Sequence, residues 1–174
     1  ERANWFAPKG VDPIDDWSFR YNKWKHVLHK GNSNAELLRT PGIYLHKKEN
    51  ALRVYMSTFN SPKNEFFDIM NIPLNKWVHI VVAVRQRFID VFINGNLVKS
   101  HKLKHLPKQN TGDVYINSNN GFGGYMSNIK YNDYYISFSE IESLVNQGPA
   151  PFVPSDNMSE KPPYFSQNWW ANSF

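Results

Sequence analysis

The stretch NKWVHIVVAVRQRFIDVFINGNLVKS, residues 75–100, constrains the fold more than any other part of the chain. Asn94-Gly95 lies between two apolar segments, and both residues tolerate the positive φ that a type I′ hairpin turn requires. A helix over 76–84 is the alternative, but that segment is rich in valine, has no helix cap and is bounded by turn signals. The stretch therefore predicts a meander of three strands that turns at 85–87 and again at Asn94-Gly95.

Short extended segments recur along the rest of the chain. Strands are predicted at 24–31 and in a hairpin over 43–60, and a short strand within 65–77 leads into the meander. Residues 113–124 predict a strand followed by a turn rich in Asn and Gly, alternation predicts a strand over 125–137, and 31–42 is predicted to be a loop. A short helix is predicted over 139–146, with Ser137 or Ser139 as N-cap, Glu140 or Glu142 completing a capping box, and Gly148-Pro149 at its end. About ten short strands and one helix predict an all-β fold, a sandwich of two antiparallel sheets.

Composition excludes several classes of site. The 174 residues include no cysteine, which rules out disulfides, thiolate metal sites and cysteine catalysis.

The net charge is +5, but the lysines are scattered, so a solvated basic face is favoured over an anionic partner. Lysines and aromatics interleave at 20–30, where a strand with one buried face explains them, so we expect no nucleic-acid partner. No run of ~20 apolar residues predicts a membrane span. The chain starts without Met or a signal peptide, so we expect Glu1 to mark a domain boundary or the start of an ordered region.

Two motifs together resemble those of a known fold family. Trp77, His79 and Asn94-Gly95 match the central hairpin of laminin-G-like, concanavalin-A-like jelly rolls. GFGGYMSNIKYNDYYISFSEIESLVNQGP, residues 121–149, matches the closing element of that family: a Gly-rich turn, a strand and a short helix that leads to Gly-Pro. The resemblance covers roughly residues 15–150 and implies a two-sheet antiparallel jelly-roll β-sandwich. It says little about function, because this fold hosts lectins, hydrolases, adhesion modules and structural proteins.

A narrower resemblance concerns four further segments. WKHVLHKG, PGIYL, NIPLNKWVHI and PPYFSQNWW are similar to laminin-G-like proteins that large DNA viruses of algae and protists encode. In that group the domain is associated with virions. The resemblance implies a virion as the location, and viral capsid proteins among the partners.

Catalytic residues are not predicted. Glycoside hydrolases of this fold need two carboxylates that face each other across the sugar, which on a strand gives Glu-x-Asp-x-Glu. That motif is absent. The nearest acidic pairs are Asp15-Asp16, whose side chains diverge on an extended backbone, and Glu140 with Glu142, which suit a helix start. We therefore expect a protein that is not an enzyme and carries no cofactor.

The six histidines invite a metal interpretation. His26 and His29 are three apart on a predicted strand, so we expect them on opposite faces. His101 and His105 flank a lysine-rich turn, and His79 is expected to pack beside the hairpin. Because some relatives of this fold bind calcium, Asp113 and Asp133 are conceivable donors, but neither lies in a recognisable calcium loop. No metal site is predicted.

A glycan site is the one small-ligand hypothesis that the residues support. Asn117, Asn119 and Asn120, with Phe122 and Tyr125 nearby, combine planar amides with aromatic rings on one loop. The simpler alternative is an Asn/Gly turn with core aromatics behind it, and that alternative is favoured.

The end of the chain differs from the rest. We expect a sandwich domain over 1–150 and an extended, proline-containing arm over 151–174. The aromatic residues of the arm are the predicted protein-interaction residues: Tyr164, Phe165, Trp169, Trp170 and Phe174. The sequence therefore predicts a non-enzymatic structural or interaction domain that contacts other protein subunits within a virion. The alternative is a carbohydrate-binding, lectin-like module.

Overall fold

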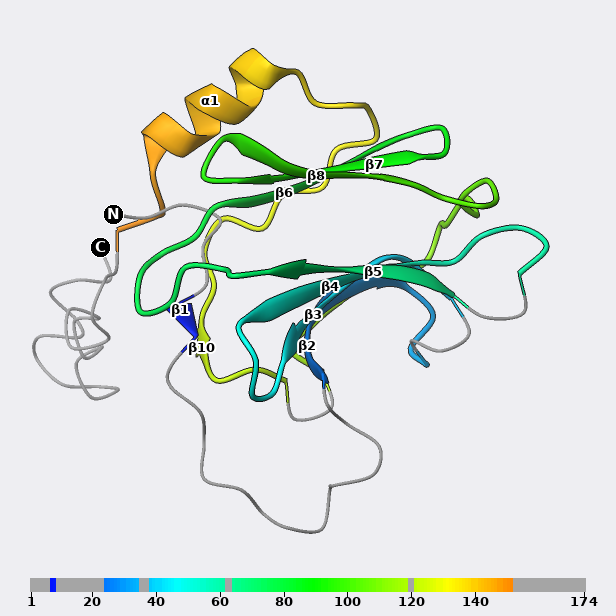
Figure 1. The fold of residues 1–174 in the computed structure, drawn as a ribbon, viewed down its shortest axis with the longest axis horizontal. Helices are drawn as coiled ribbons and strands as arrows, with labels where there is room; N and C mark the ends of the chain where they lie inside the picture. Colours follow the sequence, from blue (N-terminus) through cyan, green and yellow to red (C-terminus); the bar gives the residue numbers. More distant parts are fainter. Residues whose placement is uncertain (1–6, 9–23, 35–37, 62–63, 119–120, 152–174) are drawn as a thin grey trace, which may run out of the picture.

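The computed structural model describes residues 7–8, 24–34, 38–61, 64–118 and 121–151, and of residues 7–8 the backbone alone. Two antiparallel sheets face each other, and one short helix covers the far side of the smaller sheet (Figure 1). This confirms the predicted all-β class and is the architecture of a jelly-roll sandwich. The arm over 151–174 lies outside the described residues, apart from Pro151.

The larger sheet has five strands in the order β5-β4-β3-β2-β9. Their bounds are β2 (Trp24–Gly31), β3 (Arg39–His46), β4 (Ala51–Met56), β5 (Glu65–Met70) and β9 (Asp113–Ile116). The smaller sheet has the order β6-β7-β8. Its strands are β6 (Ile80–Arg85), β7 (Phe88–Ile93) and β8 (Asn96–Lys102). A short pair joins β1 (Ala7–Pro8) to β10 (Gly124–Tyr125).

The smaller sheet is the predicted meander. Gln86 adopts a positive φ of 54° in the first turn, and β6 pairs with β7 in register across it. In the second turn Asn94 and Gly95 have φ values of 50° and 83°, and Ile93 pairs directly with Asn96. A two-residue loop with both central φ values positive is a type I′ turn, so the prediction is confirmed.

The core lies between the two sheets. Every second residue of a strand faces it, because side chains alternate across a sheet. Leu52, Val54 and Met56 of β4 bury one alternating face against Ile89 and Val91 of β7. All five side chains are almost fully buried.

Helix α1 (Phe138–Gln147) covers the outer face of the smaller sheet. Ser137 is its N-cap and shares a capping box with Glu140, which settles the choice that the sequence left open. Gly148 follows the helix with φ 68°, as the predicted stop requires. Ile141 is buried against Ala83 and Phe92 of the sheet, so the helix closes a second, smaller core.

Two predicted boundaries are wrong. The alternating segment 125–137 was expected to be a strand, but its strand ends at Tyr125, and Asn128 with φ 50° interrupts the extended backbone. The expected loop over 31–42 is shorter, because β3 already begins at Arg39. The ladder between β2 and β3 is irregular where it passes Pro41, and such an irregularity tolerates a residue that has no N–H to donate.

Candidate binding site at the open edge of the sandwich

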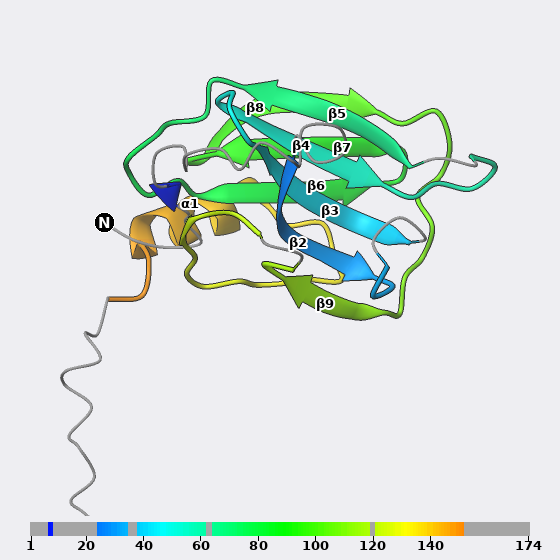
Figure 2. The ribbon, with the colours of Figure 1, turned by 90° about the horizontal axis from the view of Figure 1, so that it is seen from below.

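The two long edges of the sandwich are built differently. At one edge β5 and β8 lie against each other, and we call this the closed edge. The other edge is formed by β9 and β6, and we call it the open edge. Among the described residues β9 pairs only with β2, and β6 only with β7. Residues 126–136, the edge segment, run past this open edge without forming a strand (Figure 2).

The open edge contains a cleft of about 870 Å³. Its apolar walls come from the inner faces of both sheets and include Leu28, Ile43, Met56, Ile80, Val82 and Val84. Val114 and Ile116 of β9 and Met126 of the edge segment complete them. A cleft of this size and apolar character falls within the range of ligand and peptide sites.

The polar side of the cleft centres on Lys30. Its Nζ donates to the carbonyl oxygens of Asn110 at 2.9 Å and Gly112 at 2.6 Å. The same ammonium group lies 5.4 Å from the ring centroid of Tyr131. The ammonium group of Lys30, a residue of β2, therefore contacts both the connection before β9 and the edge segment.

Large apolar side chains on and next to the edge segment face solvent: Ile129, Tyr131, Tyr134, Tyr135 and Phe138. Two of the tyrosines keep their hydroxyls bonded, since Tyr135 donates to Asp90 at 2.8 Å and Tyr134 donates to Glu140 at 3.1 Å. Burial and the bond to Asp90 raise the pKa of Tyr135 above its ordinary value. Such a concentration of exposed rings is typical of an interaction surface.

The predicted glycan loop is divided by the structure. Asn117 has φ 50°, and its amide oxygen occupies the space that a Cβ on Gly121 would fill. Phe122 is only 8% exposed and belongs to the core, so it cannot offer its ring to a sugar. Tyr125 is 49% exposed, and its ring centroid lies 6.4 Å from that of Trp77. Asn119 and Asn120 lie outside the described residues. For these residues other than Phe122, glycan binding stays a prediction.

His26 and His29 were expected on opposite faces of β2, and this is wrong. Two residues of β2, Val27 and Leu28, lie opposite the single residue Ile43 of β3. This arrangement is a β-bulge in β2. The extra residue rotates the strand, so both histidines lie on the outer face of the larger sheet. Their rings are hydrogen-bonded through His26 Nε2 and His29 Nδ1 at 2.7 Å.

The other histidines have structural contacts. His79 is buried beside the hairpin, as predicted. Its backbone N–H donates to Asn94 Oδ1 at 2.9 Å. His101 stacks on Phe67 with ring centroids 4.4 Å apart, and burial lowers its pKa. No group of three potential metal-ligating His, Asp or Glu side chains forms within the described ranges.

The acidic residues of interest are engaged locally. Glu140 accepts from the backbone N–H and the hydroxyl of Ser137, and these bonds, with that from Tyr134, hold its pKa below the ordinary value. Glu142 is exposed on the same helix. Asp15 and Asp16 lie outside the described residues.

Sequence reasoning missed a network on the outer face of the larger sheet. Arg53 donates to both carboxylate oxygens of Asp68, at 2.6 and 2.7 Å. Its guanidinium also lies about 4 Å from the ring centroids of Trp24 and Phe66. Alternating Arg and Tyr on β4 hinted at this face, but the pairing of Arg53 with Asp68 depends on strand register. The charged groups and rings of this network therefore interact mainly with one another.

The chain leaves the described structure beside the cleft. After α1, the backbone N–H of Ala150 donates to Ser127 Oγ at 3.1 Å, and Ser127 lines the cleft. The predicted arm therefore starts at the open edge, and its five aromatic residues lie outside the described residues. None of the described helices is long and apolar enough to span a membrane.

The chain is similar to proteins of known structure, and a match with a TM-score above 0.5 supports the fold. The chain resembles the crystal structure of the botulinum neurotoxin serotype G binding domain with a TM-score of 0.54 and 13% sequence identity, over 82% of this chain and 35% of that one. The chain thus spans about a third of that domain. An S-layer domain-containing protein from Clostridium thermocellum also matches, with a TM-score of 0.34 and 15% identity over 79% of this chain and 70% of that one. No curated protein matches the sequence.

A family model accounts for most of the chain. Residues 17–142 match the laminin G type model described as the concanavalin A-like lectin/glucanases superfamily. The match includes both sheets of the described structure and the first half of α1. The chain belongs to the concanavalin A-like lectin/glucanase superfamily, as a domain of the laminin G type.

Proposed function

We propose that this chain is a non-enzymatic interaction domain that contacts other protein subunits through the open edge of its sandwich. The observation that carries the proposal is the apolar cleft between two edge strands, bordered by exposed aromatic side chains. An edge strand offers free backbone N–H and C=O groups, and an extended polypeptide can satisfy them while its side chains fill adjacent pockets. A sugar would leave most of these apolar walls without a partner.

The occupant that we propose for the cleft is the C-terminal arm of this chain, either its own or that of a neighbouring copy. Tyr164, Phe165, Trp169, Trp170 and Phe174 supply the rings. The arm starts beside the cleft at Pro151, and the twenty-three residues after Pro151 can span roughly 75 Å when extended, so the arm can reach the cleft of either molecule. Burying each ring is worth roughly 1.5–3 kcal/mol, which can offset the cost of ordering an extended backbone.

A labelled peptide of residues 159–174 tests this proposal. We expect saturable binding to a chain that ends at Pro151, and at least tenfold weaker binding when Trp169 and Trp170 are both alanine. Tyr131→Asp should weaken binding similarly, whereas Leu97→Asp, an equally exposed position on β8, should not. Absence of peptide binding, or binding that ignores all of these changes, would contradict the proposal. Comparing the oligomeric state of the full chain with that of the shortened one separates docking within one molecule from exchange between two.

We further propose a virion as the setting and capsid proteins as partners. This part rests on the resemblance to laminin-G-like proteins of large DNA viruses. Immunodetection of the protein in purified particles, and its loss after mild detergent or protease treatment of the particle surface, would test it.

A carbohydrate-binding role is the second candidate. It is favoured by the exposed ring of Tyr125, which stands near Trp77 at the end of the predicted glycan loop. A glycan array probed with the full chain tests it, with Tyr125→Ala as the variant that should lose binding. Clear glycan binding by a chain that neither assembles nor binds the arm peptide would favour this role over the first.

A further inference from the structure

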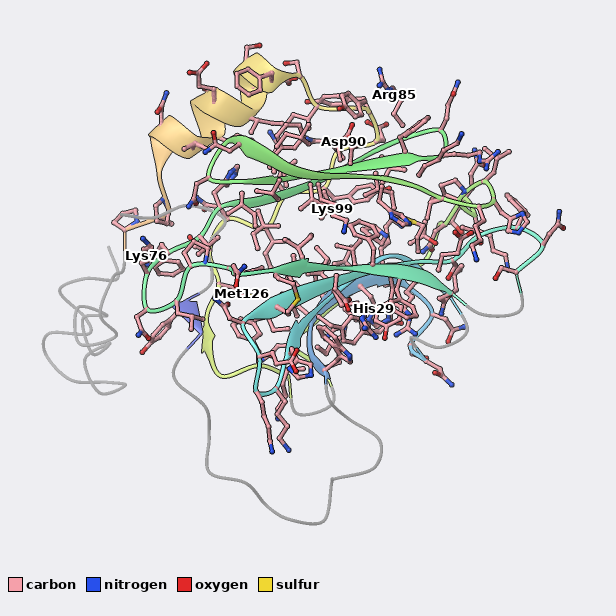
Figure 3. All side chains as sticks on the ribbon, in the orientation of Figure 1. His29, Lys76, Arg85, Asp90, Lys99 and Met126 are labelled. Carbon is pink, nitrogen blue, oxygen red and sulfur yellow. The ribbon has the colours of Figure 1, made fainter. Side chains whose placement is uncertain are left out.

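Three hydrogen bonds in series connect two turns through the imidazole rings of β2. The backbone N–H of Ser118 lies 2.9 Å from His26 Nδ1. His26 Nε2 lies 2.7 Å from His29 Nδ1, and His29 Nε2 lies 2.8 Å from the carbonyl oxygen of Asn32. The series thus runs from the turn after β9, through β2, to the turn after β2. Figure 3 labels His29 on the larger sheet.

The groups at the two ends of the series determine which nitrogen of each ring carries the proton. A backbone N–H can only donate, so His26 Nδ1 must be unprotonated and its proton must lie on Nε2. A carbonyl oxygen can only accept, so His29 carries its proton on Nε2 and offers Nδ1 as an acceptor. The bond between the rings then runs from His26 Nε2–H to His29 Nδ1. All three bonds form only when both rings are neutral and hold these tautomers.

Adding one proton to the pair has a consequence that does not depend on which ring receives it. The pair then carries three protons on four nitrogens. The contact between the rings can hold only one of them, because two N–H groups would face each other. The other two must lie on His29 Nε2, where Asn32 accepts, and on His26 Nδ1. There the new N–H faces the N–H of Ser118, and that hydrogen bond is lost.

The surroundings of the pair favour a neutral His26. His26 is 6% exposed and His29 is 1% exposed. From β3, the Tyr44 ring packs edge-on against His26, and the Arg39 guanidinium adds positive charge nearby. From β9, the ring of Tyr115 stacks on His29. Burial, and then the charges of His29 and Arg39, lower the pKa of His26 from 6.5 to about 4.

We propose that His26 and His29 form an acid-sensitive latch, in which a single proton on the pair releases Ser118 and loosens the turn at Asn117-Ser118 from β2. The bond from the backbone N–H of Asn117 to the carbonyl oxygen of Val27, 2.8 Å long, remains as the inner anchor of that turn. The latch is distinct from the open edge and does not depend on what occupies the cleft.

The direction of the pH effect follows from the lowered pKa. The closed turn binds fewer protons than the opened turn, whose exposed histidine returns toward its ordinary value. Closing is therefore favoured above pH 6.5, and the advantage is lost as the pH falls toward about 4. Taking these two values, the ratio of opened to closed turn should rise about 20-fold between pH 7 and pH 5.

Nitrogen NMR of the full chain tests the latch directly. At pH 7 we expect Nε2–H tautomers for both His26 and His29. On acidification, the amide signal of Ser118 should shift together with the His26 ring, with a midpoint below 6.5. A proton on His26 Nδ1 at pH 7, or a Ser118 amide that does not respond while the rings titrate, would overturn the proposal.

A variant of His26 distinguishes the latch from a general loss of stability at low pH. His26→Asn places an amide oxygen where Nδ1 stood, so it can accept from Ser118 without titrating. In that variant, hydrogen exchange of the Ser118 amide, corrected for intrinsic rates, should lose its excess acceleration between pH 7 and pH 5. His101→Asn, which removes a partly buried histidine on β8, should keep it. An unchanged acceleration in His26→Asn would overturn the latch, and if that variant does not fold, the ring tautomers of the wild-type chain decide.

Discussion

The two long edges of this sandwich differ in what connects one sheet to the other. At the closed edge, the Glu65 carboxylate accepts the backbone N–H groups of Lys104 and His105 and the hydroxyl of Thr58. At the open edge, no described strand joins β6 to β9, and apolar side chains of both sheets border a cleft. One carboxylate thus binds backbone N–H groups of the segment after β8 at the closed edge, whereas a cleft separates β6 from β9 at the open edge.

Under the proposed function, this difference separates residues that stabilise the fold from residues that bind a partner. Residues of the closed edge hold the two sheets together, so changing them should lower the free energy of unfolding. Residues of the open edge lie beside the cleft, so changing them should affect binding more than folding. The following substitutions challenge that division, in order of decreasing expected effect.

The largest difference is expected between two aliphatic truncations. Leu103, which follows β8 at the closed edge, is 1% exposed, whereas Ile116 of β9 at the open edge is 46% exposed. Leu103→Ala should cost ~2–5 kcal/mol of unfolding free energy, because it leaves a cavity in the core. Ile116→Ala should cost less than ~1 kcal/mol. Urea denaturation measures both, and equal losses would erase the contrast between the edges.

Glu65 should be the most important polar group of the closed edge. Burial alone would raise its pKa, but the hydrogen bonds from Lys104, Thr58 and His105 outweigh burial and hold the pKa below its ordinary value. Glu65→Ala should cost ~2–3 kcal/mol, since it leaves these donors without their acceptor. Glu65→Gln, which keeps one acceptor oxygen, should cost less.

The pH dependence offers an independent check on Glu65. A carboxylate with a lowered pKa stabilises the fold above its unfolded value of 4.5, and this stabilisation is lost as the pH falls through the folded value. Glu65→Gln should therefore flatten the acid side of a plot of stability against pH below 4.5. A variant with the wild-type slope there would mean that other groups dominate.

The turn that delivers β8 to the closed edge comes next. Gly95 has φ 83°, and a Cβ there would meet Val145 only at ordinary contact distance, so backbone strain rather than crowding should decide the outcome. Gly95→Val should cost ~1–3 kcal/mol, whereas Gly95→Asn should be tolerated, because Asn adopts positive φ readily. Thermal melts compare the two, and equal losses would point to crowding instead.

The smallest effect is expected for Lys99. Its Nζ lies 3.5 Å from the carbonyl oxygen of Asp68, across the closed edge, but the side chain is exposed. Lys99→Ala should change the unfolding free energy by less than ~0.5 kcal/mol, the usual range for surface positions. A loss as large as that of Glu65→Ala would show that this long contact matters more than its geometry suggests.

Short-range signals in the sequence determined much of this fold. The Asn94-Gly95 turn, the Ser137–Glu140 capping box and the Gly148 stop each depend on residues within a few positions, and the structure contains all three. Alternation along β4 and β7 likewise identified the core faces, because side-chain direction follows from strand geometry alone. Family motifs then extended these local elements to the two-sheet architecture.

Only the tertiary structure decided the features on which the two proposals rest. A bulge in β2 brought His26 and His29 to one face, and packing took Phe122 from the predicted glycan loop into the core. The open edge arose because the segment after Tyr125 did not continue as a strand beside β6. Each outcome depends on strand register and on contacts between residues far apart in sequence, and a local pattern contains no information about which distant neighbour will be there.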